Sequence, residues 1–227
     1  DIQGTGAVTL AGILSALRET GTSLADQRVL FLGAGSAARG IADTLVAGMM
    51  QQGGLSLTQA RQRIWMIDSK GLVTRERIDH LAAHKQDFAQ DEPPAGTLLD
   101  VIRRVVHPTV LIGVSGQSGA FTEEAIREIH KHTPRPIVFP LSNPTAKAEC
   151  TAEQAYSWTG GDALFASGSP FPPVTIDGRI FVPGQCNNMY IFPGVGMGAV
   201  SCSTAAVTDA MFYAAARTLA DQISEDS

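Results

Sequence analysis

A short glycine pattern between an apolar run and an alanine-rich segment constrains the fold of this chain more than any other feature. The run Arg28–Leu32 is apolar and bounded by polar residues and glycine, which is typical of a buried parallel strand. Gly33-x-Gly35-x-x-Ala38 follows, and residues 36 to about 52 have a helical composition. Gly33 permits a tight turn, Gly35 lets the backbone approach a pyrophosphate, and Ala38 allows close packing of helix on strand. The pattern predicts a strand, a turn and a helix that bind a dinucleotide, with a purely structural turn as the alternative.

The residues beside this pattern predict how the two ends of such a ligand are held. The backbone amides of Ser36 and Ala37 open the expected helix and would face the phosphates. The second expected strand ends at Asp68, directly before Ser69, and an acid at this place usually binds the ribose hydroxyls of adenosine. Because the usual spacing to this acid is about 20 residues, the polar stretch 51–63 is interpreted as an insertion. The alternative is a solvated acid at the end of a strand.

Segments with strand and helix patterns alternate along the chain. Further strands are expected at 64–67, 109–114, 137–139 and 164–166, and helices at 7–17, 98–106, 122–132, 151–157 and 196 to about 223. Thr122 is suited to cap one of these helices, which has acids in its first turn and bases in its last. This order predicts a Rossmann-like, doubly wound α/β fold over 1–227 as a single domain, with a mostly parallel sheet and helices on both faces.

The composition excludes several classes of protein. Hydrophobic residues make up 44% and charged residues 17%, as in a globular chain that buries a core. The net charge is −5 without a basic block, so no nucleic-acid partner is expected, and no apolar run is long enough to span a membrane. The three cysteines match no zinc spacing, which favours reduced thiols and a cytoplasmic location. The five histidines lie in polar stretches and are expected at the surface.

Three small or polar loops follow the later strands, where a doubly wound sheet binds its ligands. Gly113 and Val114 begin a glycine-rich loop that would lie beside the nicotinamide half of the cofactor. Ser142 precedes Asn143, whose side-chain amide can bond a carboxamide or a substrate carboxylate. Gly184 is followed by Gln185, Cys186 and the pair Asn187–Asn188. An ordinary glycine loop and ordinary turn-forming asparagines are the alternatives for these positions.

Six longer motifs occur in one order along nearly the whole chain. They are Asp1–Thr5, Phe31–Gly35, Leu141–Thr145, Phe165–Pro170, Gln185–Asn188 and Tyr190–Gly194. This ordered set is far more specific than the glycine pattern alone, and it resembles the malic enzymes. The segments 113–119 and 121–136 look closest to the large bacterial members of that family. The resemblance implies that the chain is the NAD(P)-binding domain of such an enzyme and a fragment of a longer protein.

The resemblance also implies an activity. Malic enzymes oxidise L-malate with NAD or NADP and decarboxylate the product, which gives pyruvate, carbon dioxide and reduced cofactor. A Mg or Mn ion holds malate, and by this resemblance Asp1 would be one of its ligands, as a hard cation prefers carboxylate oxygens. Asn143 and Asn188 would contact malate or the nicotinamide, and Thr5 would lie near the nicotinamide. The full-length enzyme is expected to be a homo-oligomer.

The resemblance leaves part of the family's machinery outside this segment. The family's catalytic Tyr and Lys and its paired Glu-Asp metal ligands belong to an N-terminal domain, so no catalytic residue is expected here and the isolated chain is expected to be inactive. A smaller departure is Ser36, where many relatives have Glu. Two alternatives stay open, namely a malolactic enzyme, which shares the motifs and makes lactate, and a dinucleotide-binding module without chemistry.

The basic residues after Asp68 bear on the choice of cofactor. The acid itself would repel a 2′-phosphate, which favours NAD. However, Ser69 and Lys70 follow at once and Lys85 comes later. In the family's NADP-using members a Ser and a Lys follow this acid, and a Lys near the Lys85 position pairs with the 2′-phosphate. We therefore expect use of NADP, alone or beside NAD, with solvated surface lysines as the alternative.

Overall fold

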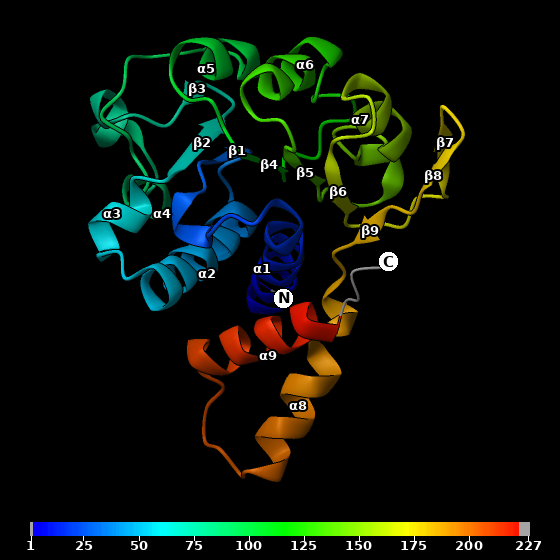
Figure 1. Cartoon of the computed structure of the whole chain (residues 1–227). Helices are drawn as coiled ribbons and strands as arrows, with labels where there is room; N and C mark the ends of the chain where they lie inside the picture. The colour runs from blue at the N-terminus through cyan, green and yellow to red at the C-terminus, as the bar shows by residue number, and fades with distance from the viewer. Residues whose placement is uncertain (1, 223–227) are drawn as a thin grey trace.

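The computed structural model describes residues 2–222, which form a seven-stranded sheet, a separate hairpin and helices around them (Figure 1). The strands are β1 Val29–Leu32, β2 Ile64–Asp68, β3 Gly71–Leu72, β4 Val110–Gly113, β5 Ile137–Pro140, β6 Leu164–Ser167, β7 Val174–Ile176, β8 Arg179–Phe181 and β9 Gly184–Gln185. The α-helices are α1 Ile2–Thr20, α2 Ser36–Gly53, α3 Leu57–Arg61, α4 Ala83–Gln86, α5 Leu98–Arg104, α6 Glu123–His132, α7 Ala152–Trp158, α8 Phe192–Ser201 and α9 Asp209–Gln222. Short 3-10 helices are η1 Leu24–Asp26, η2 Arg75–His80, η3 Thr145–Lys147 and η4 Asn188–Tyr190.

The order of the strands confirms the predicted fold class. The sheet runs β3-β2-β1-β4-β5-β6-β9, and each neighbouring pair is parallel except β2 and β3. The chain moves outward from β1 to β2 and then returns to place β4 on the other side of β1. In a sheet of this kind the strand order reverses at that point, and ligands bind outside the carboxyl ends of the two strands.

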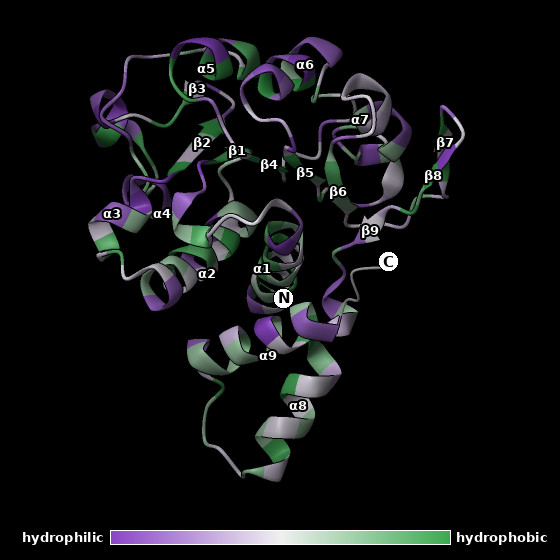
Figure 2. Cartoon of the chain, in the orientation of Figure 1, coloured by the Kyte–Doolittle hydropathy of each residue, from purple (hydrophilic) through white to green (hydrophobic). Residues whose placement is uncertain are grey.

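Alternate residues of each central strand point to opposite faces of the sheet, and each face has its own layer of helices. Val29 and Phe31 pack with α1, α2 and α9, whereas Leu30 and Trp65 pack with α5, α6 and α7. Both faces are therefore covered, which explains why these strands are continuous apolar runs. Figure 2 shows the outer turns of α6 as hydrophilic, in keeping with the burial of only Ala125, Ile126 and Ile129 in that helix.

The first two α-helices lie side by side and run in the same direction. Ile2 packs on Gly40, and one turn later Gly6 packs on Thr44. A Cβ added at Gly6 would press on the Thr44 hydroxyl and come within 3.0 Å of the Gly40 carbonyl oxygen. Because the helices are parallel, both begin at the carboxyl edge of the sheet, and the start of α1 is held close to the start of α2.

The C-terminal segment corrects one sequence prediction. A single helix from 196 to about 223 was expected, but the structure has α8 and α9 separated by an irregular segment, and residue 223 lies outside the described range. Ser203 has a left-handed backbone (φ 49°) and Thr208 bonds the Met211 amide, so the break has local causes. No residue of α8 is buried, and this helix extends away from the sheet in Figure 1.

Four short strands were not predicted from the sequence. They are β3, β9 and the hairpin of β7 and β8, whose two-residue turn is Asp177-Gly178. Both turn residues have positive φ, at 49° and 79°, as hairpin turns of this kind require. The polar stretch 51–63, expected as an insertion, contains α3, which begins with a capping box between Ser56 and Gln59.

Other expectations from composition can be compared with the structure directly. No helix within residues 2–222 has the length and apolar character needed to cross a membrane. All three cysteines are free thiols, and burial raises the pKa of Cys186 to about 12. Four of the five histidines are exposed as expected, and His130 is half-buried.

The contact between α1 and α2 predicts a stability effect. Gly6→Ala adds a methyl group where the two helices touch, and we expect it to lower the free energy of unfolding by about 1–3 kcal/mol. Gly196→Ala in α8 is the matched control, because a Cβ there meets no atom within 4 Å and should raise stability by up to about 1 kcal/mol. Urea unfolding of the 227-residue chain measures both. Equal midpoints for the two variants would contradict the close crossing.

Candidate functional site

The loops that follow the parallel strands meet along one edge of the sheet. Val114 N donates to the Leu32 carbonyl oxygen at 2.9 Å, so the loop after β4 starts level with the turn after β1. Leu141 N donates to the Gly113 carbonyl oxygen at 2.8 Å, and this places the loop after β5 beside the loop after β4. The expected ligand-binding segments 33–38, 113–119 and 141–145 are thus brought together at the carboxyl edge.

The two glycines of the turn after β1 are required for different reasons. Gly33 has φ 116°, and a Cβ added to it would lie 2.7 Å from the Val114 carbonyl oxygen. The fold itself therefore needs glycine at this position. Gly35 has an ordinary φ of −87°, and a Cβ added to it would meet no atom within 4 Å. Nothing in residues 2–222 demands glycine here, and the open space leaves room for a ligand to approach the backbone.

The start of α2 is suited to bind phosphate groups. Gly35 is the N-cap residue and provides no side chain to bond the first amides of the helix. Ser36 and Ala37 are exposed, whereas Ala38 is fully buried against the sheet, as predicted from its size. Free amides at the N-terminus of an 18-residue helix attract anions through their N–H groups and the helix dipole. The residues present therefore fit the pyrophosphate of a dinucleotide.

Asp68, at the end of β2, accepts hydrogen bonds from two basic side chains and one backbone amide. Its Oδ2 accepts from Lys85 Nζ at 2.8 Å and from Arg77 Nη2 at 3.0 Å. Its Oδ1 accepts from Arg77 Nη2 and from the Lys70 amide, both at 2.9 Å. The four bonds occupy the acceptor sites of the carboxylate, so binding a ribose hydroxyl would require the exchange of one of these donors. Ser69, the next predicted cofactor residue, is exposed beside this group.

The charges around Asp68 do not cancel. Burial alone would raise the pKa of Asp68, but the hydrogen bonds from Lys85, the Lys70 amide and Arg77 hold the pKa below its usual value. One carboxylate thus faces two cations, and the group as a whole is positive. Arg77 was not found from the sequence, because a lone arginine in a polar stretch carries no signal of its partner.

The segment that carries Lys85 is also attached to the glycine turn. His84 Nε2 lies 3.1 Å from the Ala34 carbonyl oxygen, and Arg39 Nη1 of α2 donates to the His84 carbonyl oxygen at 2.9 Å. These bonds place α4 between the phosphate-binding turn and the Asp68 group. The structure therefore places Lys85 at the end of β2, beside Asp68 and next to the glycine turn.

The loops after β4 and β5 are joined by hydrogen bonds. Gly116 N donates to Ser142 Oγ at 2.9 Å, and both loops also bond the buried carboxylate of Glu149. The Asn143–Pro144 peptide bond is cis. Asn143 is exposed, and its Oδ1 accepts from Ser169 Oγ at 2.5 Å. No residue from 2 to 222 bonds its amide nitrogen, which leaves a donor for a carbonyl or carboxylate oxygen.

The remaining predicted positions lie around the same edge. Asn187 caps η4 by accepting from the Met189 amide at 3.0 Å, so it acts as the turn former that was the alternative in the sequence. Asn188 follows it, is half-buried, and belongs to η4, which packs against α1. Thr5 is half-buried in the second turn of α1.

The predicted metal ligand cannot be placed. Asp1 lies outside the described residues, and residues 2–222 contain no group of three or more His, Cys, Asp or Glu side chains that could hold a metal ion. The start of α1 at Ile2 is nevertheless fixed on α2 near the phosphate-binding turn. The described residues on their own therefore do not fit a divalent metal site.

The different needs of Gly33 and Gly35 predict that two similar substitutions separate folding from binding. Gly35→Ala should leave the unfolding midpoint nearly unchanged and weaken dinucleotide binding, because its Cβ occupies space that only a ligand would use. Gly33→Ala should instead cost about 1–3 kcal/mol of stability, through its strained φ and the Val114 contact. Thermal unfolding and cofactor titration of both variants test this. Unaltered affinity in Gly35→Ala would mean that the turn is only structural.

Comparisons with known proteins agree with this geometry. The family model described as "Malic enzyme, NAD binding domain" matches residues 2–227. The whole chain aligns with the NADP-dependent malic enzyme of Dictyostelium discoideum at 51% identity, covering 42% of that protein, and with that of Vitis vinifera at 49%, covering 38%. The crystal structure of Entamoeba histolytica malic enzyme superimposes with a TM-score of 0.73 at 28% identity, over 95% of this chain and 40% of that one. The chain thus spans about two fifths of the length of these relatives. It belongs to the malic enzyme family and constitutes the NAD-binding domain of that family.

Proposed function

We propose that this chain is the cofactor-binding part of an enzyme that converts L-malate to pyruvate and carbon dioxide. The observation that carries the proposal is the unpaired amide nitrogen of Asn143, exposed at the edge where the loops after β4 and β5 meet. Binding of adenosine and phosphates alone would not call for a polar group in that place. We infer the reaction itself from membership of the malic enzyme family.

The chain's residues would orient the reactants in this reaction. The turn at Gly35 and the first amides of α2 bind the pyrophosphate, and the loops beginning at Val114 and Ser142 hold the nicotinamide half. Asn143 donates a hydrogen bond to a carbonyl or carboxylate oxygen, and Asn188 lies on the neighbouring segment. When bound at these residues, the nicotinamide would supply the acceptor for the hydride that leaves C2 of malate. Oxidation also releases the hydroxyl proton of malate. Loss of carbon dioxide then leaves the electron pair of the broken C3–C4 bond on C3, which takes up a proton, so that malate and the oxidised cofactor give pyruvate, carbon dioxide and the reduced cofactor.

A divalent Mg or Mn ion is part of the proposal for the full-length protein. Asp1 is the ligand that this chain would supply, and the others would come from the rest of the enzyme. Such an ion would polarise the ketone formed by oxidation and stabilise the enolate that decarboxylation leaves. The catalytic acid and base would likewise come from outside this chain, and the full-length enzyme is proposed to be a cytoplasmic homo-oligomer.

NADP is the proposed cofactor, alone or beside NAD. The group formed by Asp68, Lys85 and Arg77 supports this choice, because two cations outnumber one carboxylate at the adenosine end of the crevice. A 2′-phosphate would find charge-assisted hydrogen-bond donors there. The relatives from Dictyostelium discoideum and Vitis vinifera are both named NADP-dependent.

The activity is tested with the full-length enzyme and with this chain alone. Full-length enzyme, malate, cofactor and Mg or Mn should give reduced cofactor and pyruvate in equal amounts. Lactate in place of pyruvate would favour the malolactic alternative, and absence of any malate-dependent change would favour a module without chemistry. The isolated 227-residue chain should show no turnover, since general acid–base groups contribute roughly 10²–10⁴-fold and are expected elsewhere.

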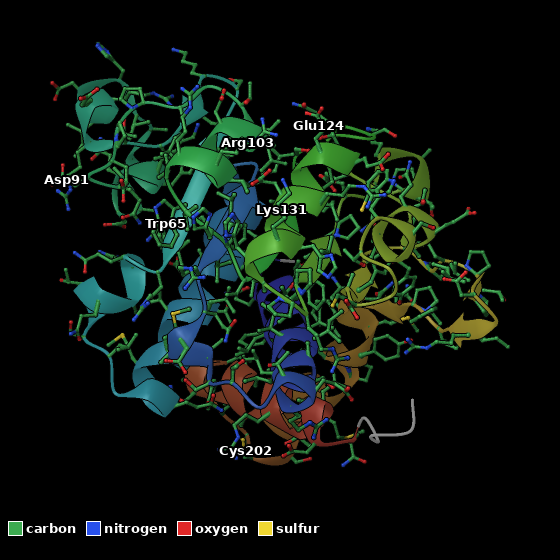
Figure 3. All side chains as sticks on the ribbon, turned by 45° about the horizontal axis from the view of Figure 1, so that its top comes forward. Trp65, Asp91, Arg103, Glu124, Lys131 and Cys202 are labelled. Carbon is green, nitrogen blue, oxygen red and sulfur yellow. The ribbon has the colours of Figure 1, made fainter. Side chains whose placement is uncertain are left out.

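Lys85 should determine how well the enzyme uses NADP. Lys85→Ala removes one of the two cations at Asp68, whereas Arg77 still holds both carboxylate oxygens. A lost charge-assisted bond is worth about 1.5–3 kcal/mol, so kcat/KM for NADP should fall about 10–100-fold while that for NAD changes little. Lys131→Ala on α6 is the control, because Lys131 lies on the outer helical layer (Figure 3). An equal fall in kcat/KM for NADP and NAD in Lys85→Ala would contradict a role for Lys85 in recognising the 2′-phosphate.

A further inference from the structure

A single buried carboxylate lies behind the loops of the nicotinamide side. Glu149 lies between η3 and α7, and its side chain has no exposed surface. Burying a carboxylate is costly unless hydrogen bonds replace those from water. The burial of Glu149 is not predictable from the sequence, because it lies in a polar stretch like that around a surface acid.

One oxygen of this carboxylate collects donors from both loops. Glu149 Oε1 accepts from the Ser115 amide and from Ser115 Oγ, each at 2.8 Å, and from Ser142 Oγ at 2.6 Å. Ser142 Oγ in turn accepts from the Gly116 amide at 2.9 Å. Ser115 Oγ likewise accepts from the Gln117 amide at 3.2 Å. Each hydroxyl thus donates to the carboxylate while accepting from a loop amide, and the loops after β4 and β5 are held through one carboxylate oxygen.

The surrounding backbone is built to admit this carboxylate. A Cβ added at Gly113 would lie 2.5 Å from both Cδ and Oε2 of Glu149, so glycine at the end of β4 leaves room for it. The Phe121 amide donates to the Glu149 carbonyl oxygen at 3.0 Å, and Gly119 N donates to the Ala148 carbonyl oxygen at 3.3 Å. The segment carrying Glu149 therefore supports the loop after β4 at its beginning and at its end.

We propose that Glu149 is a positioning residue that fixes the loops after β4 and β5 in the arrangement needed by the nicotinamide half of the cofactor. This inference rests on the proposed function, which places the nicotinamide at these loops. Glu149 acts through Ser115 and Ser142, and Ser142 directly precedes Asn143, the exposed amide of the site. The adenosine end is held by other groups, at Asp68 and the glycine turn, and does not depend on Glu149.

The test compares the two halves of the cofactor in the full-length enzyme. Glu149→Gln keeps the size of the side chain but gives the Ser115 and Ser142 donors a weaker, uncharged acceptor. We measure the affinity for intact NADPH and NADH and, separately, for 2′,5′-ADP and ADP, which lack the nicotinamide. Affinity for the intact cofactors and kcat/KM for malate should fall about tenfold or more, whereas affinity for the adenosine fragments should stay within about twofold.

Two further variants keep the result interpretable. Ser115→Ala removes a single hydroxyl from the same network and should cause a smaller loss of the same kind, even if Glu149→Gln proves unstable. Glu128→Gln on α6 is the matched control, because Glu128 likewise accepts several side-chain hydrogen bonds, in its case from Arg103 and Lys131, which lie on the outer helical layer (Figure 3). It should leave both cofactor halves unaffected.

The outcomes separate this inference from the proposed function. Equal losses for the intact cofactors and the adenosine fragments would overturn the inference and make Glu149 a support of the whole domain. Unchanged cofactor affinity in both Glu149→Gln and Ser115→Ala would overturn it as well. The affinities are measured without turnover. An enzyme with no malate activity would therefore refute the proposed function, but the affinities for intact cofactors and adenosine fragments would still test the role of Glu149.

Discussion

The contact of the Gly33 backbone with the Val114 carbonyl group is the constraint on which the rest of the site depends. It brings the turn after β1 against the loop after β4, at the one place where the strand order reverses. A side chain at Gly33 would separate the two loops. Their contact places the start of α2, with its free amides, level with the loops after β4 and β5. Backbone packing therefore sets the positions of the loops at the ligand-binding edge, and polar side chains are not needed for this.

The residues at the two ends of this edge, around Asp68 and around Glu149, are held in place by different physical means. At the adenosine end, half-exposed cations gather around Asp68, and their effect extends into solvent. At the nicotinamide end, Glu149 is buried and acts on the loops through its hydrogen bonds with Ser115 and Ser142. The first arrangement suits recognition of charge, and the second suits fixed geometry. A hydride acceptor must be held to within a fraction of an ångström, whereas a phosphate tolerates more freedom.

The sequence reveals local features better than long-range ones. The turn at Gly33 and the cap at Thr122 were predicted correctly, because each depends on neighbours within one turn of chain. The hairpin at 177–178 carried the same kind of local signal, an Asp-Gly pair, and was overlooked. Arg77 and Glu149 are different, because their partners are chosen by the fold and nothing in their own neighbourhood marks them. Such residues become visible only when the strands are placed side by side.

The ion pairs of Asp68 have a consequence for the entropy of binding. Lysine and arginine side chains are long, and ordering one at an interface costs about 0.5–1.5 kcal/mol. Here the protein itself orders Lys85 and Arg77, since Asp68 bonds both side chains. An anion that reaches them meets donors that are preorganised, and little freedom is left to lose. The negative charge that seems to oppose a phosphate thus lowers the entropic cost of binding one.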